Sequence, residues 1–390
     1  MQSEMLTDVL IVGAGLVGAS LAVAIGGASL RVALVEAKPP VAAAPADWDS
    51  RIYAISPANR AFLDTIGVWG RLDPARMASV QQMTVFGDRR SRIEFSAYEA
   101  GVESLAWIVE SGALARALWS VMERQPNLTL VCPAIPERLE LSESAARLSL
   151  DSGRSVDARL VVGADGAQSF VRDQASIRAD RKPYGQLGVV ANFYCERPHR
   201  GTAFQWFRED GVLAWLPLPE NRISMVWSTS EAHAQELLVM PPDALCQCVA
   251  DAGANTLGQL KLITAPAAFP LARMTVSSMV AQRVALIGDA AHVVHPLAGQ
   301  GVNLGFGDAA ELAKVLLSVR PGRDVGDRLL LRRFERARAE DILAMRWATH
   351  GLERLFLAGK PGLGAVRNLG LNFVDRMQVL KMLLVKHALG

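Results

Sequence analysis

The stretch that decides the fold lies near the N-terminus and reads Asp8-Val-Leu-Ile-Val-Gly-Ala-Gly-Leu-Val-Gly18. The apolar run at 8–12 predicts a buried strand, and a glycine turn follows it at 13–18. A helix is predicted at 19–28, and a second strand at 31–35. This order of strand, turn, helix and strand is the context in which a GxGxxG motif binds a dinucleotide.

Each residue of this motif has a predicted role. Gly13 permits the tight turn, Gly15 lets a pyrophosphate approach the backbone, and Gly18 lets the helix pack closely. Glu36 closes the second strand 21 positions after Gly15, where an acid accepts hydrogen bonds from ribose hydroxyls and repels a 2′-phosphate. The motif therefore predicts FAD or NAD rather than NADP, and the alternative is a tight turn with a purely structural use.

A second strand, loop and helix are predicted late in the chain, between Arg283 and Asp308. Residues 284–287 form a short apolar run that ends at Gly288-Asp289, and a loop containing Pro296, Gly299 and Gly301 leads to a helix. The apolar residues of that helix recur at helical spacing: Val302, Phe306, Ala309, Ala313 and Leu316. A loop without bulky side chains before a helix N-terminus favours an anion or a reduced ring, although Gly288-Asp289 alone also fits an ordinary turn.

Two further segments carry candidate site residues. The segment Asp49-Ser-Arg-Ile-Tyr-Ala-Ile-Ser56 contains Arg51, for which a structural salt bridge is the alternative role. A predicted hairpin over 148–162 ends in Gly163-Ala-Asp-Gly166, followed by Ser169 as a predicted helix cap.

The string His295-Pro-Leu-Ala-Gly-Gln-Gly301, with Asn303, Gly305 and Asp308 behind it, resembles the signature of the ubiquinone-biosynthesis hydroxylases. These are FAD-dependent aromatic monooxygenases with the p-hydroxybenzoate hydroxylase fold. The other segments follow in the order of that family, so the resemblance covers nearly the whole chain. It implies that Arg51 lies beside the flavin and its diphosphate, and that Asp165 and Gly166 meet both FAD and the nicotinamide cofactor.

The resemblance also implies the reaction. NADH or NADPH reduces FAD, O₂ adds at flavin C4a, and the resulting hydroperoxide hydroxylates the aromatic ring of a prenylated phenol in ubiquinone biosynthesis. Amides near Gly301 would stabilise the reduced flavin, and His295 and Pro296 are candidates for lining the reaction site. The predicted cofactor-binding residues are Gly13, Gly15, Gly18, Glu36, Arg51, Asp165, Gly166, Gly288, Asp289, Pro296, Gly299, Gly301, Val302 and Asn303.

Two alternatives to this function remain open. One is a flavin hydroxylase of another aromatic substrate. The other is a non-catalytic flavoprotein subunit of a biosynthetic complex, although a scaffold would have no use for Gly301, Asn303 and Asp165.

The predicted fold class is α/β, with a Rossmann-type FAD-binding domain, an inserted antiparallel β-sheet substrate domain and C-terminal helices. The FAD-binding domain is predicted to be discontinuous. The predicted boundaries are 1–80, 101–178 and 281–330 for the FAD-binding domain, 81–100 and 179–280 for the substrate domain, and 331–390 for the helical region. Aromatic residues in the predicted strands of 187–230 could line a pocket, but are expected mostly to form core.

Composition excludes several other classes of protein. The 41 basic and 39 acidic residues leave no strong field for nucleic acid, and four cysteines are too few for a disulfide framework. No metal site is predicted, because Pro296 follows His292 and His295 and no carboxylate completes a ligand set. The N-terminus lacks the basic region of a secretory signal, so a cytoplasmic protein is expected.

The last part of the chain is predicted to be helical. The run Arg332-Arg-Phe-Glu-Arg-Ala-Arg338 is expected to form a solvated basic face. Residues 369–389 are rich in Leu, Met and Val with interspersed cations, which suits either docking on the protein or peripheral contact with the inner face of the cytoplasmic membrane. The oligomeric state is not predicted.

Overall fold

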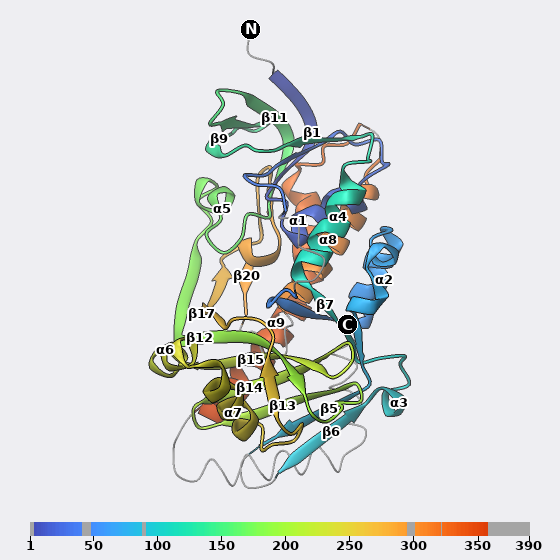
Figure 1. The fold of residues 1–390 in the computed structure, drawn as a ribbon. Coiled ribbons are helices and arrows are strands. Elements are labelled where there is room, and N and C mark those ends of the chain that lie inside the picture. Colours follow the sequence, from blue (N-terminus) through green and yellow to red (C-terminus); the bar gives the residue numbers. More distant parts are fainter. Residues whose placement is uncertain (1–3, 41–47, 88–90, 295–300, 321, 358–390) are drawn as a thin grey trace.

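A twisted parallel sheet of Rossmann type forms the upper part of the molecule in Figure 1. The computed structural model describes residues 4–40, 48–87, 91–294, 301–320 and 322–357. In spatial order the parallel strands are β8 (Leu128–Val131), β2 (Val32–Val35), β1 (Glu4–Val12), β11 (Ser155–Gly163) and β19 (Val284–Leu286). Antiparallel strands extend this Rossmann sheet: β18 (Val280–Ala281) pairs with β19, and the hairpin β9 (Pro136–Leu141) and β10 (Ala146–Leu150) pairs with β11.

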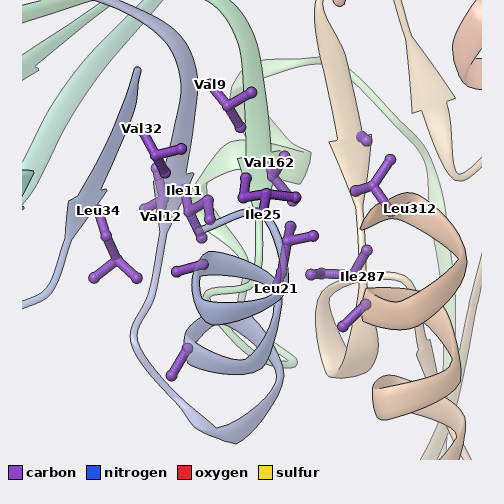
Figure 2. Packing of buried hydrophobic residues seen from close by; sticks show 14 of the residues in the cluster. Val9, Ile11, Val12, Leu21, Ile25, Val32, Leu34, Val162, Ile287 and Leu312 are labelled. Atoms are coloured by element: carbon purple, nitrogen blue, oxygen red, sulfur yellow. The ribbon is translucent and has the colours of Figure 1, made fainter. Parts of the chain in front are cut away.

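The composition of β1 explains its central position. Val9, Leu10 and Ile11 are each 0% exposed, because a parallel strand covered on both faces needs apolar side chains at every position. Figure 2 shows Val9 and Ile11 among the side chains of α1 and of the neighbouring strands. The predicted strand and turn at the N-terminus are confirmed.

Among the described residues, five helices pack around the Rossmann sheet. They are α1 (Leu16–Ala24), α4 (Ser111–Met122), α5 (Phe170–Gln174), α8 (Gly301–Leu317) and α9 (Arg328–Leu357). Helix α1 packs against both α4 and α8, and α9 packs against α8. The five apolar residues predicted to recur along the helix after Gly301 are all buried, so that prediction is confirmed.

A large, mainly antiparallel sheet forms the lower part of the molecule (Figure 1). Its strands in spatial order are β20 (His292–Val293), β17 (Ala267–Val276), β12 (Ala179–Cys195), β15 (Arg222–Ser230), β14 (Gly211–Leu218), β13 (Thr202–Arg208), β5 (Gln82–Phe86) and β6 (Arg92–Ser96), with β16 (Leu260–Leu262) beside β12. The predicted antiparallel strands over 187–230 are confirmed. Two helices follow these strands, α6 (Glu231–Val239) and α7 (Pro242–Ala252).

The two faces of the large sheet differ in composition. The outer face, covered by α6 and α7, holds the bulky aromatics Phe193, Trp206, Trp215 and Trp227 in one hydrophobic cluster. These four residues are core, as expected. The opposite, inner face carries smaller and more polar side chains and packs on the small sheet described next.

A small sheet lies between the Rossmann sheet and the large sheet. It consists of β3 (Ile52–Ile55), β7 (Ala106–Glu110) and β4 (Ala78–Val80), and it leads into α2 (Pro57–Thr65). Ile52 and Ile108 of this sheet pack with Leu216 and Leu218 of the large sheet. The segment 48–55 is therefore in contact with the inner face of the large sheet.

The helix after Ser56 ends at Thr65, and a short 3₁₀ turn (Trp69–Arg71) follows it. One predicted surface differs from the structure. The expectation of a solvated face over 332–338 was wrong for Arg338, which is buried, although Arg332, Arg333 and Arg336 are exposed. Two further short elements are a 3₁₀ turn (Pro74–Arg76) and helix α3 (Ala97–Ala100). In the part of the chain that the structure describes, no helix is long and apolar enough to cross a membrane.

Candidate functional site

The glycine turn after β1 has a geometry that only glycine accepts at two of its three positions. Gly13 has φ +100°, and a Cβ there would lie 2.5 Å from the carbonyl oxygen of Ala164. A Cβ on Gly18 would lie 2.0 Å from the carbonyl oxygen of Gly13. Around Gly15, in contrast, nothing lies within 4 Å of a built Cβ, so this residue faces open space at the N-terminus of α1. The first and third glycines pack the fold, and the second faces the space that a ligand would use.

Glu36 lies at the carboxyl end of β2, next to this turn. Its Oε2 accepts a 2.6 Å hydrogen bond from the N–H of Ala14, and its Oε1 accepts a 3.0 Å bond from the N–H of Lys38. A carboxylate has room for further donors beyond these two. The ribose hydroxyls of an adenosine could therefore bind to Glu36 without breaking the turn.

Arg51 lies on a segment that Asp49 holds in place. Asp49 Oδ1 accepts a 2.8 Å hydrogen bond from the Arg51 N–H, and its Oδ2 accepts a 2.9 Å bond from the Gly112 N–H at the start of α4. The Arg51 side chain is exposed, with its guanidinium carbon 5.6 Å from the ring centroid of Tyr53. An exposed guanidinium at this edge suits a diphosphate or another anion.

Asp165 and Gly166 follow the carboxyl end of β11. Asp165 Oδ2 accepts a 3.0 Å hydrogen bond from the Val171 N–H, whereas its Oδ1 is buried with no partner among the described residues. Burial raises the pKa of this carboxyl, and hydrogen bonds from Ser169 and nearby backbone groups lower it in part. Gly166 has φ +82°, and the predicted cap is confirmed, because the Ser169 side chain accepts from the Arg172 N–H. The unpartnered Oδ1 is a place for a ligand donor.

Gly288 and Asp289 begin the short 3₁₀ segment that follows β19. Gly288 has φ +60°, and its N–H donates a 2.9 Å hydrogen bond to Asp308 Oδ2. The Asp289 side chain is exposed to solvent but lies among many protein atoms, and this environment raises its pKa. His292 and then Arg51 lower that pKa in part. Arg51 and Asp289, far apart in sequence, are therefore close enough for the charge of Arg51 to act on the Asp289 carboxyl.

Val17 connects the two predicted cofactor motifs. A Cβ on Gly305 would lie 2.5 Å from Val17 Cγ2, and a Cβ on Gly288 would lie 3.2 Å from the same atom. The absence of side chains at these glycines lets α1 and α8 approach each other closely. As a result both helix N-termini lie near the same edge of the Rossmann sheet.

Asn303, in the first turn of α8, forms hydrogen bonds through both ends of its side-chain amide. Its Oδ1 accepts hydrogen bonds from the Ser56 N–H at 3.1 Å and from Asn59 Nδ2 at 3.0 Å, and its Nδ2 donates to the Ala54 carbonyl at 2.8 Å. This side chain therefore fixes α8 to the junction of β3 and α2. What remains for a ligand is the backbone of the first turn, whose N–H groups have no acceptor within the helix.

A buried cluster of three charged residues supports the segment at Gly288. His292 Nε2 lies 2.6 Å from Asp308 Oδ2, and Arg338 Nε donates to Asp308 Oδ1 at 2.8 Å. Burial alone would raise the pKa of Asp308, but His292 and Arg338 lower it overall. Burial alone would lower the pKa of His292, but Asp308 raises it overall.

The role of this cluster was missed by sequence reasoning. The signal was present, because Leu331, Phe334 and Arg338 are spaced three and four residues apart, and the first two are 0% exposed. Arg338 thus lies on the apolar face of α9.

Three of the predicted site residues, His295, Pro296 and Gly299, lie outside the described residues. Gly301 begins α8, where nothing lies within 4 Å of a built Cβ, and Val302 is buried behind it.

The described residues fit FAD. Open backbone at Gly15 and Gly301, a carboxylate at Glu36 and an unpartnered acceptor at Asp165 lie along one edge of the Rossmann sheet. A parallel sheet with a GxGxxG turn, a helix N-terminus and an acid at its carboxyl edge defines the class of dinucleotide-binding α/β proteins. The arrangement can hold an adenosine diphosphate and present a flavin to the inner face of the large sheet.

Comparison with known proteins agrees with this class. Residues 6–345 match the family described as FAD binding domain, and the chain belongs to this family. It is 36% identical over 389 residues to the ubiquinone hydroxylase UbiL of Rhodospirillum rubrum, covering 100% of this chain and 90% of the relative. It is also 35% identical over 390 residues to the 3-demethoxyubiquinol 3-hydroxylase of Escherichia coli, covering 98% of each chain.

Solved structures support the fold. The p-nitrophenol 4-monooxygenase PnpA of Pseudomonas putida superposes with a TM-score of 0.81 at 18% identity, covering 100% of this chain and 99% of that one. The predicted α/β fold, with its parallel FAD sheet, antiparallel sheet and C-terminal helices, is confirmed. The family and its full-length relatives establish the protein as an FAD-dependent monooxygenase, as predicted.

Proposed function

We propose that this monooxygenase hydroxylates the aromatic ring of a prenylated ubiquinone precursor, with NADH or NADPH as reductant and O₂ as oxidant. The observation that carries the proposal is the identity of 35–36% to two hydroxylases of ubiquinone chemistry over nearly the whole chain. The flavin supplies the activated oxygen when it is bound. The protein residues bind it, orient the ring and exclude water.

The cofactor site is part of this proposal. The pyrophosphate is assigned to the open backbone at Gly15 and the adenosine ribose to Glu36. Arg51 balances the charge of the diphosphate, and Asp165 Oδ1 accepts a hydrogen bond from the bound cofactor. The remaining predicted residues belong to the same proposed site: Gly13, Gly18, Gly166, Gly288, Asp289, Pro296, Gly299, Gly301, Val302 and Asn303.

The first turn of α8 is assigned to the flavin ring. Seventeen residues of helix direct the positive end of their dipole at this turn. Negative charge that develops on a reduced ring next to Gly301 and Val302 would be stabilised there without any charged side chain. The side-chain bonds of Asn303 keep this turn at a fixed distance from β3.

The prenyl tail is the finer part of the substrate proposal. The names of relatives of this chain place them in ubiquinone chemistry. A ubiquinone precursor carries a prenyl tail that resides in lipid. We therefore propose a cytoplasmic protein that meets its substrate at the inner face of the membrane. Sedimentation with vesicles that contain a prenylated phenol, compared with vesicles lacking it, tests this part separately.

The decisive experiment follows the purified protein through reduction and product formation. Its absorption spectrum is recorded, then the rate of flavin bleaching by NADH or NADPH with and without a prenylated phenol. The masses of the products formed under ¹⁸O₂ are finally measured by mass spectrometry. Flavin bands, bleaching accelerated by the phenol, and a product carrying one ¹⁸O atom are the expected results.

Other outcomes would identify the alternatives. A yellow protein that transfers oxygen only to a soluble aromatic acid would favour a hydroxylase of a different substrate. A yellow protein that no phenol stimulates would favour a non-catalytic subunit. A colourless protein that takes up no FAD would refute the cofactor assignment.

A further inference from the structure

Asn192 lies where the large sheet touches the segment that carries Arg51. It belongs to β12, is 0% exposed, and its Nδ2 donates a 2.9 Å hydrogen bond to the carbonyl oxygen of Asp49. Its backbone is also fixed, since its N–H donates to Thr264 Oγ1 at 2.9 Å and its carbonyl accepts from the Ile263 N–H at 2.8 Å. The side chain is therefore a rigid link between β12 and residue 49.

Asp49 connects Asn192 to the segment that carries Arg51. Besides its bonds to the N–H groups of Arg51 and Gly112, its own N–H donates to Glu110 Oε1 at 2.7 Å. Glu110 is 3% exposed and receives two bonds from Arg76, at 2.6 and 2.8 Å. The peptide at Asp49 is thus held from several sides, and a displacement of Asn192 would move Arg51.

The oxygen end of the Asn192 amide has no such partner. The Asp49 carbonyl can only accept a hydrogen bond, so the nitrogen of the Asn192 amide must face it. The amide oxygen therefore points away from Asp49. Asn192 Oδ1 is buried without a hydrogen-bond partner among the described residues, and so is the Oγ of Ser224. Ser224 is also 0% exposed and lies directly opposite Asn192 on β15. Unpaired buried polar atoms of this kind mark a place for a ligand group or a water.

The surface beside these two atoms is small and apolar. Val190 and Val226 lie two positions along the same strands and therefore on the same inner face, and Ala214 pairs with Val226. Exposure increases from 0% at Asn192 to 6% at Val190 and 7% at Ala214, and Val226 is half-exposed. In the described part of the chain none of these three belongs to a packed hydrophobic cluster. A flat ring could lie on them with one polar substituent at the enclosed end.

We propose that Asn192 is a specificity-determining and positioning residue for the aromatic substrate, an inference that rests on the proposed function. Its Oδ1, together with Ser224 Oγ, binds a hydroxyl group on the ring, while its Nδ2 holds Asp49 and hence Arg51. One amide thus connects the proposed substrate face to the cofactor segment. The ligand must carry a donor, because Asn192 Oδ1 can only accept.

The first experiment compares a phenol with its methyl ether, which lacks the donor. Dissociation constants for the two ligands are measured by calorimetry with the FAD-loaded protein. The wild type should bind the phenol about tenfold more tightly, the ratio expected for one hydrogen bond. Asn192→Leu should bind both ligands with a ratio near one. Ser224→Ala removes a donor to the ring oxygen, which the phenol and the ether both offer, so it should weaken the binding of both ligands and leave their ratio near the wild-type value.

The second experiment separates the two ends of the amide. The phenol should accelerate flavin reduction by NADH or NADPH in the wild type and in Ser224→Ala, because Asn192 still holds Asp49 in both. In Asn192→Leu this acceleration should fall severalfold even when the variant is saturated with FAD. A purely structural role would lower FAD content without changing the ligand ratio.

Clear results would overturn the inference. If Asn192→Leu keeps the wild-type ratio, a bound water rather than a substrate hydroxyl occupies the position. If Asn192→Leu does not hold FAD, a wild-type ratio near one, or unchanged binding of both ligands by Ser224→Ala, refutes the proposal. Failure of the wild type to hydroxylate any phenol would instead refute the proposed function.

Discussion

His292 Nε2 lies 2.6 Å from Asp308 Oδ2, with 4% of the histidine and none of the aspartate exposed. The same Oδ2 accepts the N–H of Gly288, the residue before Asp289. A buried carboxylate is thereby shared between a charged partner and the backbone of a predicted cofactor motif. The conformation of that motif depends on two residues, His292 and Arg338, that are separate from the motif.

Replacing Arg338 with leucine should destabilise the protein strongly. The change removes one partner of a buried carboxylate, and such losses cost about 3–5 kcal/mol of unfolding free energy. Urea unfolding followed by tryptophan fluorescence measures it. Arg333, exposed on the same helix, provides the matched control, and Arg333→Leu should change the free energy by about 0.5 kcal/mol or less. Equal effects of the two substitutions would contradict a buried role for Arg338.

The stability of the protein should fall as the pH rises above about 6.5, the ordinary pKa of histidine. The pKa of His292 is raised in the folded state, so its stabilising contribution is complete below the unfolded pKa and is lost as pH rises through the folded pKa. The groups that face it are Asp308, Asp289 and Arg338. In His292→Gln this part of the pH dependence should disappear.

Unfolding midpoints at several pH values between 6 and 9 test this prediction. The difference between wild type and His292→Gln isolates His292, because the other titrating groups are common to both proteins. A constant difference across this range would mean that His292 does not change its protonation there.

The periodic parts of the fold were predictable from the sequence. The apolar run at Val9 and the spacing of Phe306 and Ala309 indicate burial directly, because side chains on a covered strand or helix face must be apolar. The position of Arg338 was not predictable from composition. A run of arginines usually covers a solvated surface. Only the spacing of Arg338 from Leu331 and Phe334 pointed to burial, and its buried partner Asp308 lies 30 positions away.

The candidate site was predictable only as far as its motifs extend. Glycines and acids at fixed spacing indicated Gly15, Glu36 and Asp289, because backbone approach to a ligand needs particular residues at particular offsets. Asn192 carries no such signal, since one asparagine in an apolar strand has no local pattern. Its importance arises from a contact with Asp49, 143 positions away in the chain.

Alanine substitutions in the glycine turn should separate folding from cofactor binding. Gly13→Ala should destabilise the protein, because φ is +100° and the new Cβ would lie 2.5 Å from a carbonyl oxygen. Gly15→Ala enters open space, so stability should stay within about 0.5 kcal/mol of the wild type. FAD affinity of this second variant should nevertheless fall by about tenfold or more, roughly 1.4 kcal/mol.

Thermal unfolding of the apoprotein and fluorescence titration with FAD measure these two quantities. Normal FAD affinity in Gly15→Ala would show that the pyrophosphate does not lie against this residue. Loss of stability in Gly15→Ala would contradict the open space that surrounds it.

The two ends of the Asn303 amide can be tested separately. Asn303→Leu leaves the Ser56 N–H and the Ala54 carbonyl without their partner, and each unpaired buried group costs about 1–3 kcal/mol. Asn303→Asp keeps the acceptor for Ser56 and Asn59 and loses only the donor to Ala54, so it should be the more stable of the two.

Asn303→Asp also places a negative charge in the first turn of α8. If that turn stabilises the reduced flavin, the two-electron reduction potential of Asn303→Asp should fall by about 30 mV, the equivalent of roughly 1.4 kcal/mol. Spectroscopic titration against a reference dye measures the potential, and an unchanged value would place the flavin away from the N-terminus of α8.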